Sequence, residues 1–543
     1  MSHTVQVVMA QIDPLVGDIV GNVERIIDAA ERARDELDAD LVVFPELSLV
    51  GCPPEDLLLR HGLYPQVQDA LTELCKRVKD VAIVVGYPMM DALGERFNMA
   101  AWIYDDLIQA SYMKQNLPNY GVFDEQRYFS SGKKSCVIEF KGIHFGLVIC
   151  EDIWRPGPVI QAARAGADVI LNLNASPFHA EKHHDRLQVA RRRVDEVKLP
   201  LIYVNQVGGQ DELVFDGGSF AMDADGEIQV QAQEFEVDLI PVELVKQADN
   251  IVLINGQQAE LYRSEARVYE AIKLGIRDYV QKNGFKGVLL GLSGGLDSAL
   301  TLALAVDALG ADQVEAVMMP FHYTAQMSID DAQQQADTMG VAYHCLPIES
   351  IYQGFESSLA PRFEGIAPDL TEENLQARIR GCLLMAMSNK LGKLVLATSN
   401  KSESAVGYST LYGDMAGGFS PLKDVPKTLV YRLAHYRNGI SPVIPERVIT
   451  RPPSAELRPD QCDQDSLPDY HVLDAIIKAY VELDQTPAEI YAQALASKEE
   501  IDRVVGLIQR SEYKRRQAAP GVRISMRAFG RDRRYPITSG YKE

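Results

Sequence analysis

The sequence lacks several features that would assign it to whole classes of protein. Among its 543 residues there is no apolar run long enough to span a membrane, so we expect no membrane partner. The N-terminal segment has no basic stretch followed by an apolar one, which predicts no signal peptide and a cytoplasmic location. The seven cysteines include no CxxC pair, which argues against a disulfide framework and against a structural zinc site.

The chain is also poor in positive charge. It has 76 acidic residues against 54 Lys and Arg, for a formal net charge of −22. Such a chain repels nucleic-acid phosphates unless it carries a local basic patch, so we expect no nucleic-acid partner. One basic patch lies near the C-terminus, and it fits either a solvated surface or subunit contact, or a site for a small anionic ligand. Its residues are Lys514, Arg515, Arg516, Arg523, Arg527, Arg531, Arg533 and Arg534.

The length predicts two domains, because 543 residues exceed what one hydrophobic core usually supports. Strand and helix patterns alternate through residues 1–235, which predicts an α/β domain. We interpret the acidic, proline-bearing stretch 236–257 as a linker. In residues 258–543 a long helix at about Ala259–Lys282 precedes further alternating strands and helices, which favours a doubly wound parallel sheet.

A glycine-rich loop follows the apolar strand Val288–Leu290 and opens a predicted helix. Its small residues let backbone N–H groups approach a phosphate, and a helix N-terminus adds partial positive charge. Asp297 does not favour a bare phosphate, so it implies a bridging cation, most simply Mg²⁺. The loop lacks the GxxxxGK[ST] pattern of Walker-type sites. Its residues are Gly291, Leu292, Ser293, Gly294, Gly295, Leu296, Asp297 and Ser298.

This loop resembles the SGGxDS pyrophosphate loop of the ATP pyrophosphatases. In that superfamily the loop holds the β- and γ-phosphates of ATP while a nucleophile attacks the α-phosphate. The resemblance implies ATP as co-substrate and a Rossmann-like, doubly wound parallel sheet of the ATP pyrophosphatase type. A tRNA-modifying ATP pyrophosphatase remains an alternative, although the net charge and the absence of cysteine pairs argue against it.

A candidate thiol nucleophile ends an apolar strand in the first half. The run Ile143–Ile149 leads directly into Cys150, where a side chain is held rigidly at the edge of a sheet. Taken alone, a cysteine in this position is usually just a buried residue. Two other strands end in groups that change this interpretation, because Glu46 follows one and Lys114 follows the other.

These three segments resemble the nitrilase, or carbon–nitrogen hydrolase, superfamily. The matching stretches LVVFPELSLVGCPPEDLL, YMKQNLPNYGVFDEQRYF and GLVICEDIW follow the family's order, and the resemblance spans nearly all of residues 1–235. It implies an α-β-β-α sandwich in which Glu46 is the base, Cys150 attacks an amide to form a thioester and Lys114 stabilises the oxyanion. Glu125 is implied as a further carboxylate that positions this group, with a solvated loop charge as the alternative. A stand-alone nitrilase-type amidase, whose second half only binds nucleotide, remains open.

Together the two halves resemble the glutamine-dependent NAD⁺ synthetase family. The second half carries ATSNKSESAVGYSTLYGDMAGGFSPLKDVPKT over 397–428, and the C-terminal YKRRQAAPGVRIS agrees. The resemblance implies that glutamine is hydrolysed in the first domain and that ammonia passes through an internal tunnel to the second. There it attacks adenylated deamido-NAD⁺, so the products are NAD⁺, AMP, pyrophosphate and glutamate. A homo-oligomer is also implied, and GMP or asparagine synthetases fit less well because their glutaminase domains differ.

The same resemblance implies ligand contacts residue by residue. For glutamine the contacts are Tyr120, Ser176 and Lys182, of which the first two fit equally well as ordinary polar loop residues. For ATP, Thr398 joins the glycine-rich loop, and Asp297 and Glu403 are the implied Mg²⁺ ligands. For deamido-NAD⁺ the contacts are Asn374, Glu403 and Lys514. A helix-surface charge and a helix cap are the alternatives for Glu403 and Asn374.

Overall fold

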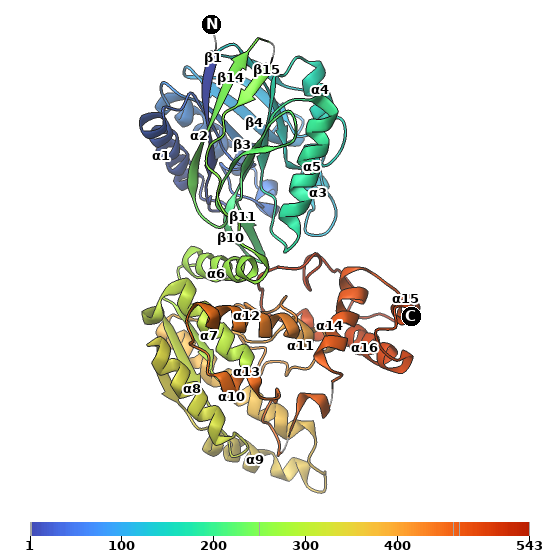
Figure 1. Ribbon diagram of the computed structural model, residues 1–543. Helices are drawn as coiled ribbons and strands as arrows, with labels where there is room; N and C mark the ends of the chain where they lie inside the picture. The colour runs from blue at the N-terminus through green and yellow to red at the C-terminus, as the bar shows by residue number, and fades with distance from the viewer. Residues whose placement is uncertain (1–2, 249, 460, 466, 542–543) are drawn as a thin grey trace. The chain divides into compact units, whose positions relative to one another are not determined.

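The computed structural model divides the chain into two compact units, Met1–Tyr262 and Arg263–Glu543 (Figure 1). The residues that it describes are 3–248, 250–459, 461–465 and 467–541. Within these residues, no helix combines the length and the apolar character needed to cross a bilayer.

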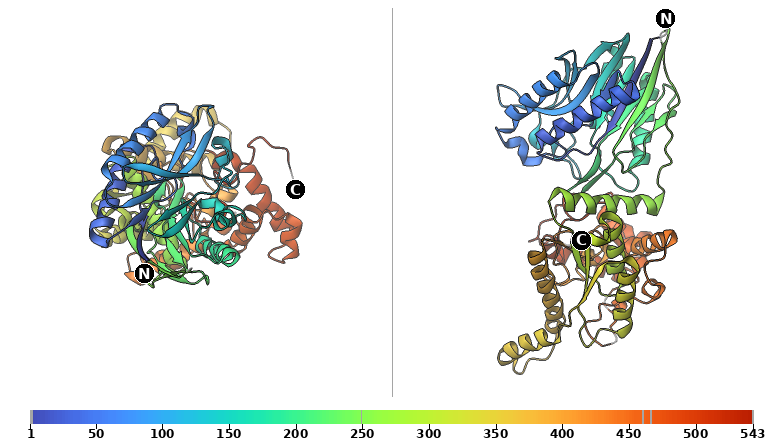
Figure 2. Two further views of the ribbon diagram at one scale, coloured as in Figure 1. Left: turned by 90° about the horizontal axis from the view of Figure 1, so that it is seen from above. Right: turned by 90° about the vertical axis from the view of Figure 1, so that its left-hand side faces the viewer.

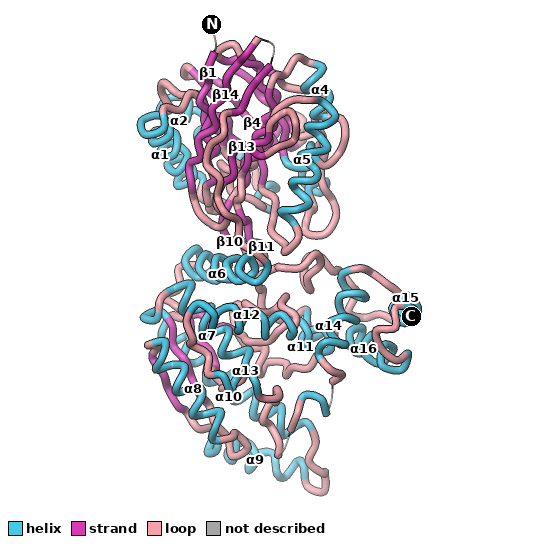
Figure 3. The backbone as a smooth tube through the Cα atoms, viewed as in Figure 1, coloured by secondary structure: helices cyan, strands magenta, loops and turns pink. Residues whose placement is uncertain are grey.

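The first unit is a sandwich of two β-sheets with helices on both outer faces (Figures 1 and 3). The seven-stranded sheet has the order β15-β14-β1-β2-β3-β4-β5, and the six-stranded sheet has the order β13-β12-β9-β8-β7-β6. Its helices are α1 (Ile19–Leu37), α2 (Leu63–Arg77), α3 (Glu125–Tyr128), α4 (Pro158–Arg164) and α5 (Lys182–Val197), with short 3₁₀ turns η1 (Glu55–Leu59) and η2 (Cys150–Ile153).

The strands of the seven-stranded sheet are β1 (His3–Gln11), β2 (Leu41–Val43), β3 (Ala82–Met90), β4 (Arg96–Tyr104), β5 (Leu107–Met113), β14 (Asp238–Gln247) and β15 (Asn250–Leu253). Those of the six-stranded sheet are β6 (Val137–Phe140), β7 (Ile143–Ile149), β8 (Val169–Asn174), β9 (Leu201–Asn205), β12 (Phe220–Met222) and β13 (Ile228–Gln231). A separate hairpin consists of β10 (Val207–Gln210) and β11 (Leu213–Asp216).

The alternation of side chains along β1 explains why one face of the sheet packs against the second sheet and the other face packs against helices. Val7 and Met9 point into the apolar core between the two sheets, whereas Val8 and Ala10 pack against α1 and α2 on the outer face. Figure 2 shows α1 and α2 lying across that face in its right-hand view. The six-stranded sheet repeats the arrangement, because its outer face packs against α4 and α5. The predicted α-β-β-α sandwich is therefore confirmed.

The predicted linker at 236–257 is wrong, because most of this stretch belongs to the first sheet. Strand β14 pairs antiparallel with the full length of β1, and β15 pairs with β14. Ile240, Val242 and Leu244 are completely buried in the core between the sheets. Pro241 and the charged residues between these positions obscured the apolar alternation in the sequence. The first unit consequently extends to Tyr262.

The second unit is built on a four-stranded parallel sheet of order β18-β17-β16-β19. Its strands are β16 (Val288–Gly291), β17 (Val314–Met318), β18 (Ala342–Cys345) and β19 (Leu394–Leu396). The chain moves outward from β16 to β18 and then returns to the other side of β16. This reversal of strand order confirms the doubly wound type, in which ligands bind at the carboxyl ends of the strands beside the reversal.

The second unit is rich in helices. They are α6 (Ser264–Lys282), α7 (Leu296–Leu309), α8 (Gln326–Met339), α9 (Glu349–Phe363), α10 (Leu370–Leu391), α11 (Lys401–Val406), α12 (Lys427–Ile440), α13 (Glu446–Thr450), α14 (Tyr470–Ile477), α15 (Pro487–Ala492), α16 (Lys498–Arg510) and α17 (Glu512–Arg515). Shorter turns are η3 (Ala311–Gln313), η4 (Asp463–Asp465) and the π-helical η5 (Lys478–Glu482).

Three of the eight residues of the C-terminal basic patch are buried inside the second unit. Arg515 and Arg533 are buried and share Glu512, at 2.8 and 3.1 Å. Arg523 is also buried and lies 2.6 Å from Asp532. These three arginines are therefore not part of a solvated surface, because each is buried against an acidic side chain of the same unit.

Two candidate active sites

The thiol site begins at the turn where β7 ends. Cys150 is 4% exposed and starts the 3₁₀ turn η2 with a φ of 43°. A non-glycine residue with positive φ at the end of a buried strand is locally strained, and such strain is typical of functional positions. The preceding strand β7 holds this turn in place, because it is paired on both sides, with β8 and with β6.

A completely buried lysine connects two carboxylates beside this turn. Lys114 follows β5, and its Nζ lies 2.5 Å from Glu46 Oε1 and 2.7 Å from Glu125 Oε1. Asn98 Nδ2 donates to Glu46 Oε1 at 2.8 Å, and the backbone N–H of Ala175 donates to Glu46 Oε2 at 3.1 Å. The structure thus brings Glu46, Lys114 and Glu125 together and fixes both oxygens of Glu46.

The electrostatics of this group determine its protonation. Burial and then the charge of Glu46 raise the pKa of the Cys150 thiol well above its usual value, and Lys114 opposes this only in part. Burial works against the charge on Lys114, but Glu125 and Glu46 outweigh it and hold the pKa of Lys114 well above its usual value. Burial also raises the pKa of Glu125 to about 8. The thiol is therefore protonated at neutral pH and needs a base when it attacks.

Two residues predicted to contact glutamine lie against the turn after Cys150. Tyr120 is half exposed, and its hydroxyl donates to Glu151 Oε2 at 2.8 Å. The Nζ of Lys182, at the start of α5, lies 3.9 Å from the ring centroid of Trp154. Burial raises the pKa of Glu151. Sequence reasoning overlooked Glu151 and Trp154, although both lie within the GLVICEDIW stretch that identified Cys150.

Ser176, the third predicted glutamine contact, is held by a buried polar network. Its backbone N–H donates to Asn205 Oδ1 at 2.9 Å, and its hydroxyl accepts from Arg186 Nε at 3.2 Å. Arg186 also binds Asp216 through two hydrogen bonds of 2.8 Å. The network aligns the end of β8 with α5, because Arg186 is a residue of that helix. No motif in the sequence indicated Arg186.

The second site begins with the glycine-rich loop between β16 and α7. Ser298 Oγ lies 3.0 Å from Ser293 Oγ and donates to the carbonyl of Gly295 at 2.9 Å. Gly294 has a φ of 76°, and a β-carbon there would lie 2.3 Å from the carbonyl oxygen of Ser328. Only glycine fits at this position, so the close turn that exposes the loop's N–H groups depends on it.

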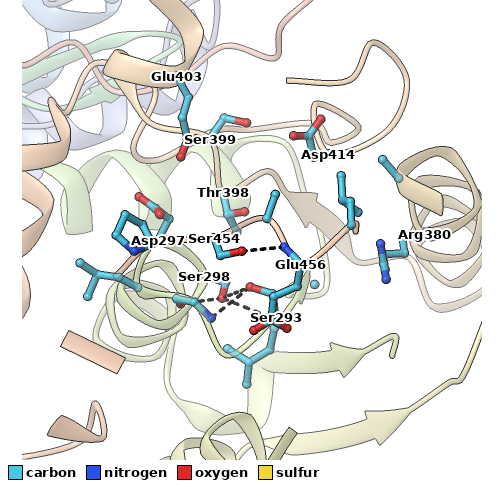
Figure 4. A pocket seen from close by; sticks show the side chains of 18 of the residues that line it. Ser293, Asp297, Ser298, Arg380, Thr398, Ser399, Glu403, Asp414, Ser454 and Glu456 are labelled. Atoms are coloured by element: carbon cyan, nitrogen blue, oxygen red, sulfur yellow. Dashed lines mark hydrogen bonds between the residues drawn. The ribbon is translucent and has the colours of Figure 1, made fainter. Parts of the chain in front are cut away.

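A pocket opens over this loop, within the second unit (Figure 4). All the loop residues except Gly294 line it, together with Thr398 and Glu403. Figure 4 shows Arg380 on the opposite side of the pocket from Asp297. Arg380 Nε donates to the carbonyl of Met319 at 2.9 Å, and burial lowers the pKa of Arg380 to about 10. Sequence reasoning overlooked this cation, which is a candidate contact for an anionic group in the pocket.

A second buried lysine faces two carboxylates at the mouth of the loop. Lys427, at the start of α12, donates to Asp297 Oδ2 and lies 3.8 Å from Glu403 Oε1. Asn400 Nδ2 donates to the other oxygen of Asp297 at 2.9 Å. Burial and then the charge of Asp297 raise the pKa of Glu403 to about 8. Neither Lys427 nor Asn400 was predicted as a site residue, although both lie within the 397–428 stretch.

This cluster fits a divalent cation. Asp297 and Glu403 already converge on a positive group, and the nearby carboxyl of Asp463, whose pKa is raised by burial, adds further acidity. In the described part of the chain, no set of three or more His, Cys, Asp or Glu side chains forms a metal cage. Two carboxylates with remaining positions supplied by phosphate oxygens and water suit Mg²⁺, which binds nucleotides in this way.

The two remaining predicted contacts lie behind the pocket wall. Asn374 Oδ1 accepts from Thr410 Oγ1 at 2.7 Å, and Thr410 lines the pocket. Lys514 Nζ donates to the carbonyls of Gly407 and Ser409 at 2.8 and 2.7 Å, and burial lowers its pKa. The structure therefore brings Thr398 and Glu403 to the loop, but it connects Asn374 and Lys514 to the pocket only through neighbouring residues.

Comparison with known families gives one match for each unit. The carbon–nitrogen hydrolase family model matches residues 6–248, and the NAD synthase family model matches residues 268–518. Each matched range includes one of the two sites.

Whole-chain comparison gives relatives that contain both units. The glutamine-dependent NAD(+) synthetase of Acinetobacter baylyi is 51% identical over 539 residues, which cover 99% of each chain. The glutamine-dependent NAD(+) synthetase of Xylella fastidiosa (strain 9a5c) is 46% identical, and the match covers 100% of each chain. The solved structure of the Acinetobacter baumannii glutamine-dependent NAD+ synthetase in complex with ADP is 48% identical, has a TM-score of 0.81 and is 99% covered.

Proposed function

The chain belongs to the family of glutamine-dependent NAD⁺ synthetases, and we propose that each of its two sites carries out one half of that reaction. The observation that supports this most strongly is the presence in one chain of two buried lysine–carboxylate clusters with different neighbours. One adjoins a thiol, and the other adjoins a glycine-rich phosphate loop. Glutamine, ATP and deamido-NAD⁺ are the proposed substrates.

In the glutaminase half, Glu46 takes the proton of the Cys150 thiol as the sulfur attacks the side-chain carboxamide of glutamine. A C–S bond forms, and the ammonium of Lys114 stabilises the oxyanion. The C–N bond then breaks, Glu46 returns the proton to the departing nitrogen, and ammonia leaves behind a thioester. Glu46 next takes a proton from water, which hydrolyses the thioester to glutamate. Tyr120, Ser176 and Lys182 are the proposed glutamine contacts.

In the synthetase half, a carboxylate oxygen of deamido-NAD⁺ attacks the α-phosphate of ATP and pyrophosphate leaves. Ammonia attacks the resulting acyl-adenylate and AMP leaves. The backbone N–H groups of the loop and the N-terminus of α7 bind the departing pyrophosphate, while Lys427 offsets its charge. Asp297 and Glu403 would hold Mg²⁺, which neutralises phosphate charge when bound. Thr398 is the further proposed ATP contact, and Asn374, Glu403 and Lys514 are those proposed for deamido-NAD⁺.

Ammonia must stay unprotonated between the two reactions, because ammonium has no free electron pair for attack. Most ammonia released into neutral water would be protonated. We therefore propose that it passes through a dry internal tunnel, a proposal that rests on this chemistry. A cytoplasmic homo-oligomer is the proposed form of the enzyme.

The test supplies ATP, Mg²⁺ and deamido-NAD⁺ together with either glutamine or ammonium. Both nitrogen sources should yield NAD⁺, with one AMP and one pyrophosphate for each NAD⁺. Release of ADP in place of AMP would contradict the proposed adenylation. Glutamine hydrolysis without NAD⁺ formation under any condition would favour a stand-alone amidase.

A further inference from the structure

Asp152 is a completely buried carboxylate that the chemistry proposed above does not use. It lies two residues after Cys150, within the turn η2, and its side chain is 0% exposed. Burial raises the pKa of Asp152 to about 6, so the group is still ionised at neutral pH. A buried charge needs a specific set of partners, and those of Asp152 are informative.

Both oxygens of Asp152 are fully used as acceptors. Oδ1 accepts from the backbone N–H groups of Asn116, at 2.8 Å, and Gln115, at 3.2 Å. Oδ2 accepts from the Tyr112 hydroxyl, at 2.8 Å, and from the backbone N–H of Ile149, at 3.1 Å. Four bonds fill the usual accepting capacity of a carboxylate.

These donors come from the two segments that carry the reacting groups. Tyr112, Gln115 and Asn116 flank Lys114, whereas Ile149 directly precedes Cys150. Strand β5, which leads to Lys114, is in the seven-stranded sheet, and β7, which leads to Cys150, is in the six-stranded sheet. The two segments therefore share no β-ladder, and the carboxylate of Asp152 is a polar link between them.

We propose that Asp152 is a positioning residue that sets the place of the Lys114 ammonium relative to the Cys150 sulfur. The inference rests on the glutaminase half of the proposed function. A misplacement of about 1 Å in such a group can cost on the order of 100-fold in rate. Asp152 acts through the backbone on either side of the two residues and touches neither the substrate nor the reacting atoms.

The substitution Asp152→Asn tests the proposal with little change in shape. The amide can accept on one side only, and its NH₂ group then faces donors that previously bound a carboxylate. We expect kcat for glutamine hydrolysis to fall about 100-fold while KM stays unchanged. Alkylation of Cys150 by iodoacetamide does not use Lys114 as an oxyanion contact, so its rate should stay unchanged, as should NAD⁺ formation from ammonium.

Asp223→Asn is the matched control in the same unit. Asp223 lies in the turn between β12 and β13, where it accepts bonds of 2.9 Å from the N–H groups of Asp225 and Glu227. It also accepts from Gln229 Nε2 at 2.6 Å. The same loss of an accepting oxygen occurs there away from Lys114 and Cys150, so kcat for glutamine should not change.

Wild-type kcat in Asp152→Asn would overturn the proposal. It would also be overturned if the fall in kcat came with an equal fall in the alkylation rate and a lower melting temperature, because Asp152 would then only stabilise the fold.

Should Asp152→Asn not fold, Tyr112→Phe removes one of the four donors and should lower kcat about tenfold at constant KM. An unchanged kcat in Tyr112→Phe would then overturn the proposal. Failure of the proposed function would appear differently, as a wild-type enzyme that makes no NAD⁺ from glutamine.

Discussion

The two sites share an electrostatic arrangement and differ in what surrounds it. Lys114 is buried between Glu46 and Glu125, and Lys427 is buried against Asp297 and near Glu403. In both cases burial opposes the lysine charge and the carboxylates outweigh it, so each pKa lies above its usual value. Both lysines therefore remain cationic at any pH at which the enzyme works.

The neighbours decide what each cation can do. Beside Glu46 lies a small apolar cluster that includes Ala175 and Phe215, and the adjacent nucleophile is a thiol. Lys427 instead faces a pocket lined by a glycine-rich loop with a helix N-terminus behind it. One lysine is thus suited to an oxyanion at a carbonyl carbon and the other to phosphate oxygens. The carboxylates around each buried lysine hold its charge in a fixed place. The neighbouring thiol or phosphate loop then indicates which reaction that charge serves.

The largest effect should come from removing the nucleophile of one site only. Cys150→Ala should lower NAD⁺ formation from glutamine at least about 1000-fold, because no thioester can form. NAD⁺ formation from ammonium should be retained, and Cys136→Ala, which changes a half-buried cysteine outside the site, should affect neither. Loss of both activities in a folded Cys150→Ala protein would show that the sites are not separable.

Removing the second lysine should reverse this pattern. Lys427→Met leaves Asp297 and Glu403 without their cation, and NAD⁺ formation from either nitrogen source should fall on the order of 100-fold. The alkylation rate of Cys150 should not change. Lys273→Met, which removes a lysine paired with Glu270 on α6, is the control and should keep full activity. Undiminished NAD⁺ formation from ammonium by Lys427→Met would show that Lys427 does not serve the second site as Lys114 serves the first.

The pH dependence of the Mg²⁺ requirement should be smaller and confined to the second site. The pKa of Glu403 is about 8, so below this pH the carboxyl is mostly protonated and a cation must displace the proton. The Mg²⁺ concentration for half-maximal NAD⁺ formation from ammonium should therefore fall as the pH rises from about 7 to about 9. In Glu403→Gln this requirement should be higher and should lose most of its pH dependence. An identical pH dependence in the variant would show that Glu403 does not hold the metal.

The smallest effect concerns stability in the first unit. The pKa of Glu125 is raised from 4.5 to about 8, so between these values the folded chain binds more protons than the unfolded chain. Stability from this group is present at low pH and decreases as the pH rises through that window. Glu125→Gln cannot ionise, so its melting temperature should fall less between pH 5.5 and pH 8.5 than that of the wild type, by about 5 °C or more. A steeper fall in the variant would contradict the raised pKa.

The sequence predicted those parts of the sites that lie within short motifs. Glu46, Lys114 and Cys150 each come shortly after a strand, and Ser293 and Asp297 belong to one continuous loop segment, so local pattern was enough to place them. The two fold types followed from the same alternation of strands and helices. The linker prediction failed because Pro241 interrupts the pattern of β14, whose partner β1 lies at the other end of the unit.

The residues that sequence reasoning overlooked act across long separations. Lys427 reaches Asp297 across 130 positions, and Asn98 reaches Glu46 across 52. Asp152 lies only two residues after the nucleophile, but its partners at 112–116 become visible only when the two sheets are packed together. Such pairings depend on tertiary contacts, which the hydrophobic periodicity of one segment does not predict.

The most direct measurement follows the nitrogen from one site to the other. The enzyme is supplied with ATP, Mg²⁺, deamido-NAD⁺ and glutamine labelled with ¹⁵N at the amide, together with an equal concentration of unlabelled ammonium, and the NAD⁺ is analysed by mass spectrometry. The account predicts that most of the NAD⁺ carries ¹⁵N, because ammonia released at Cys150 reaches the second site before it mixes with the solvent. NAD⁺ with the isotope ratio of the bulk ammonium would contradict it.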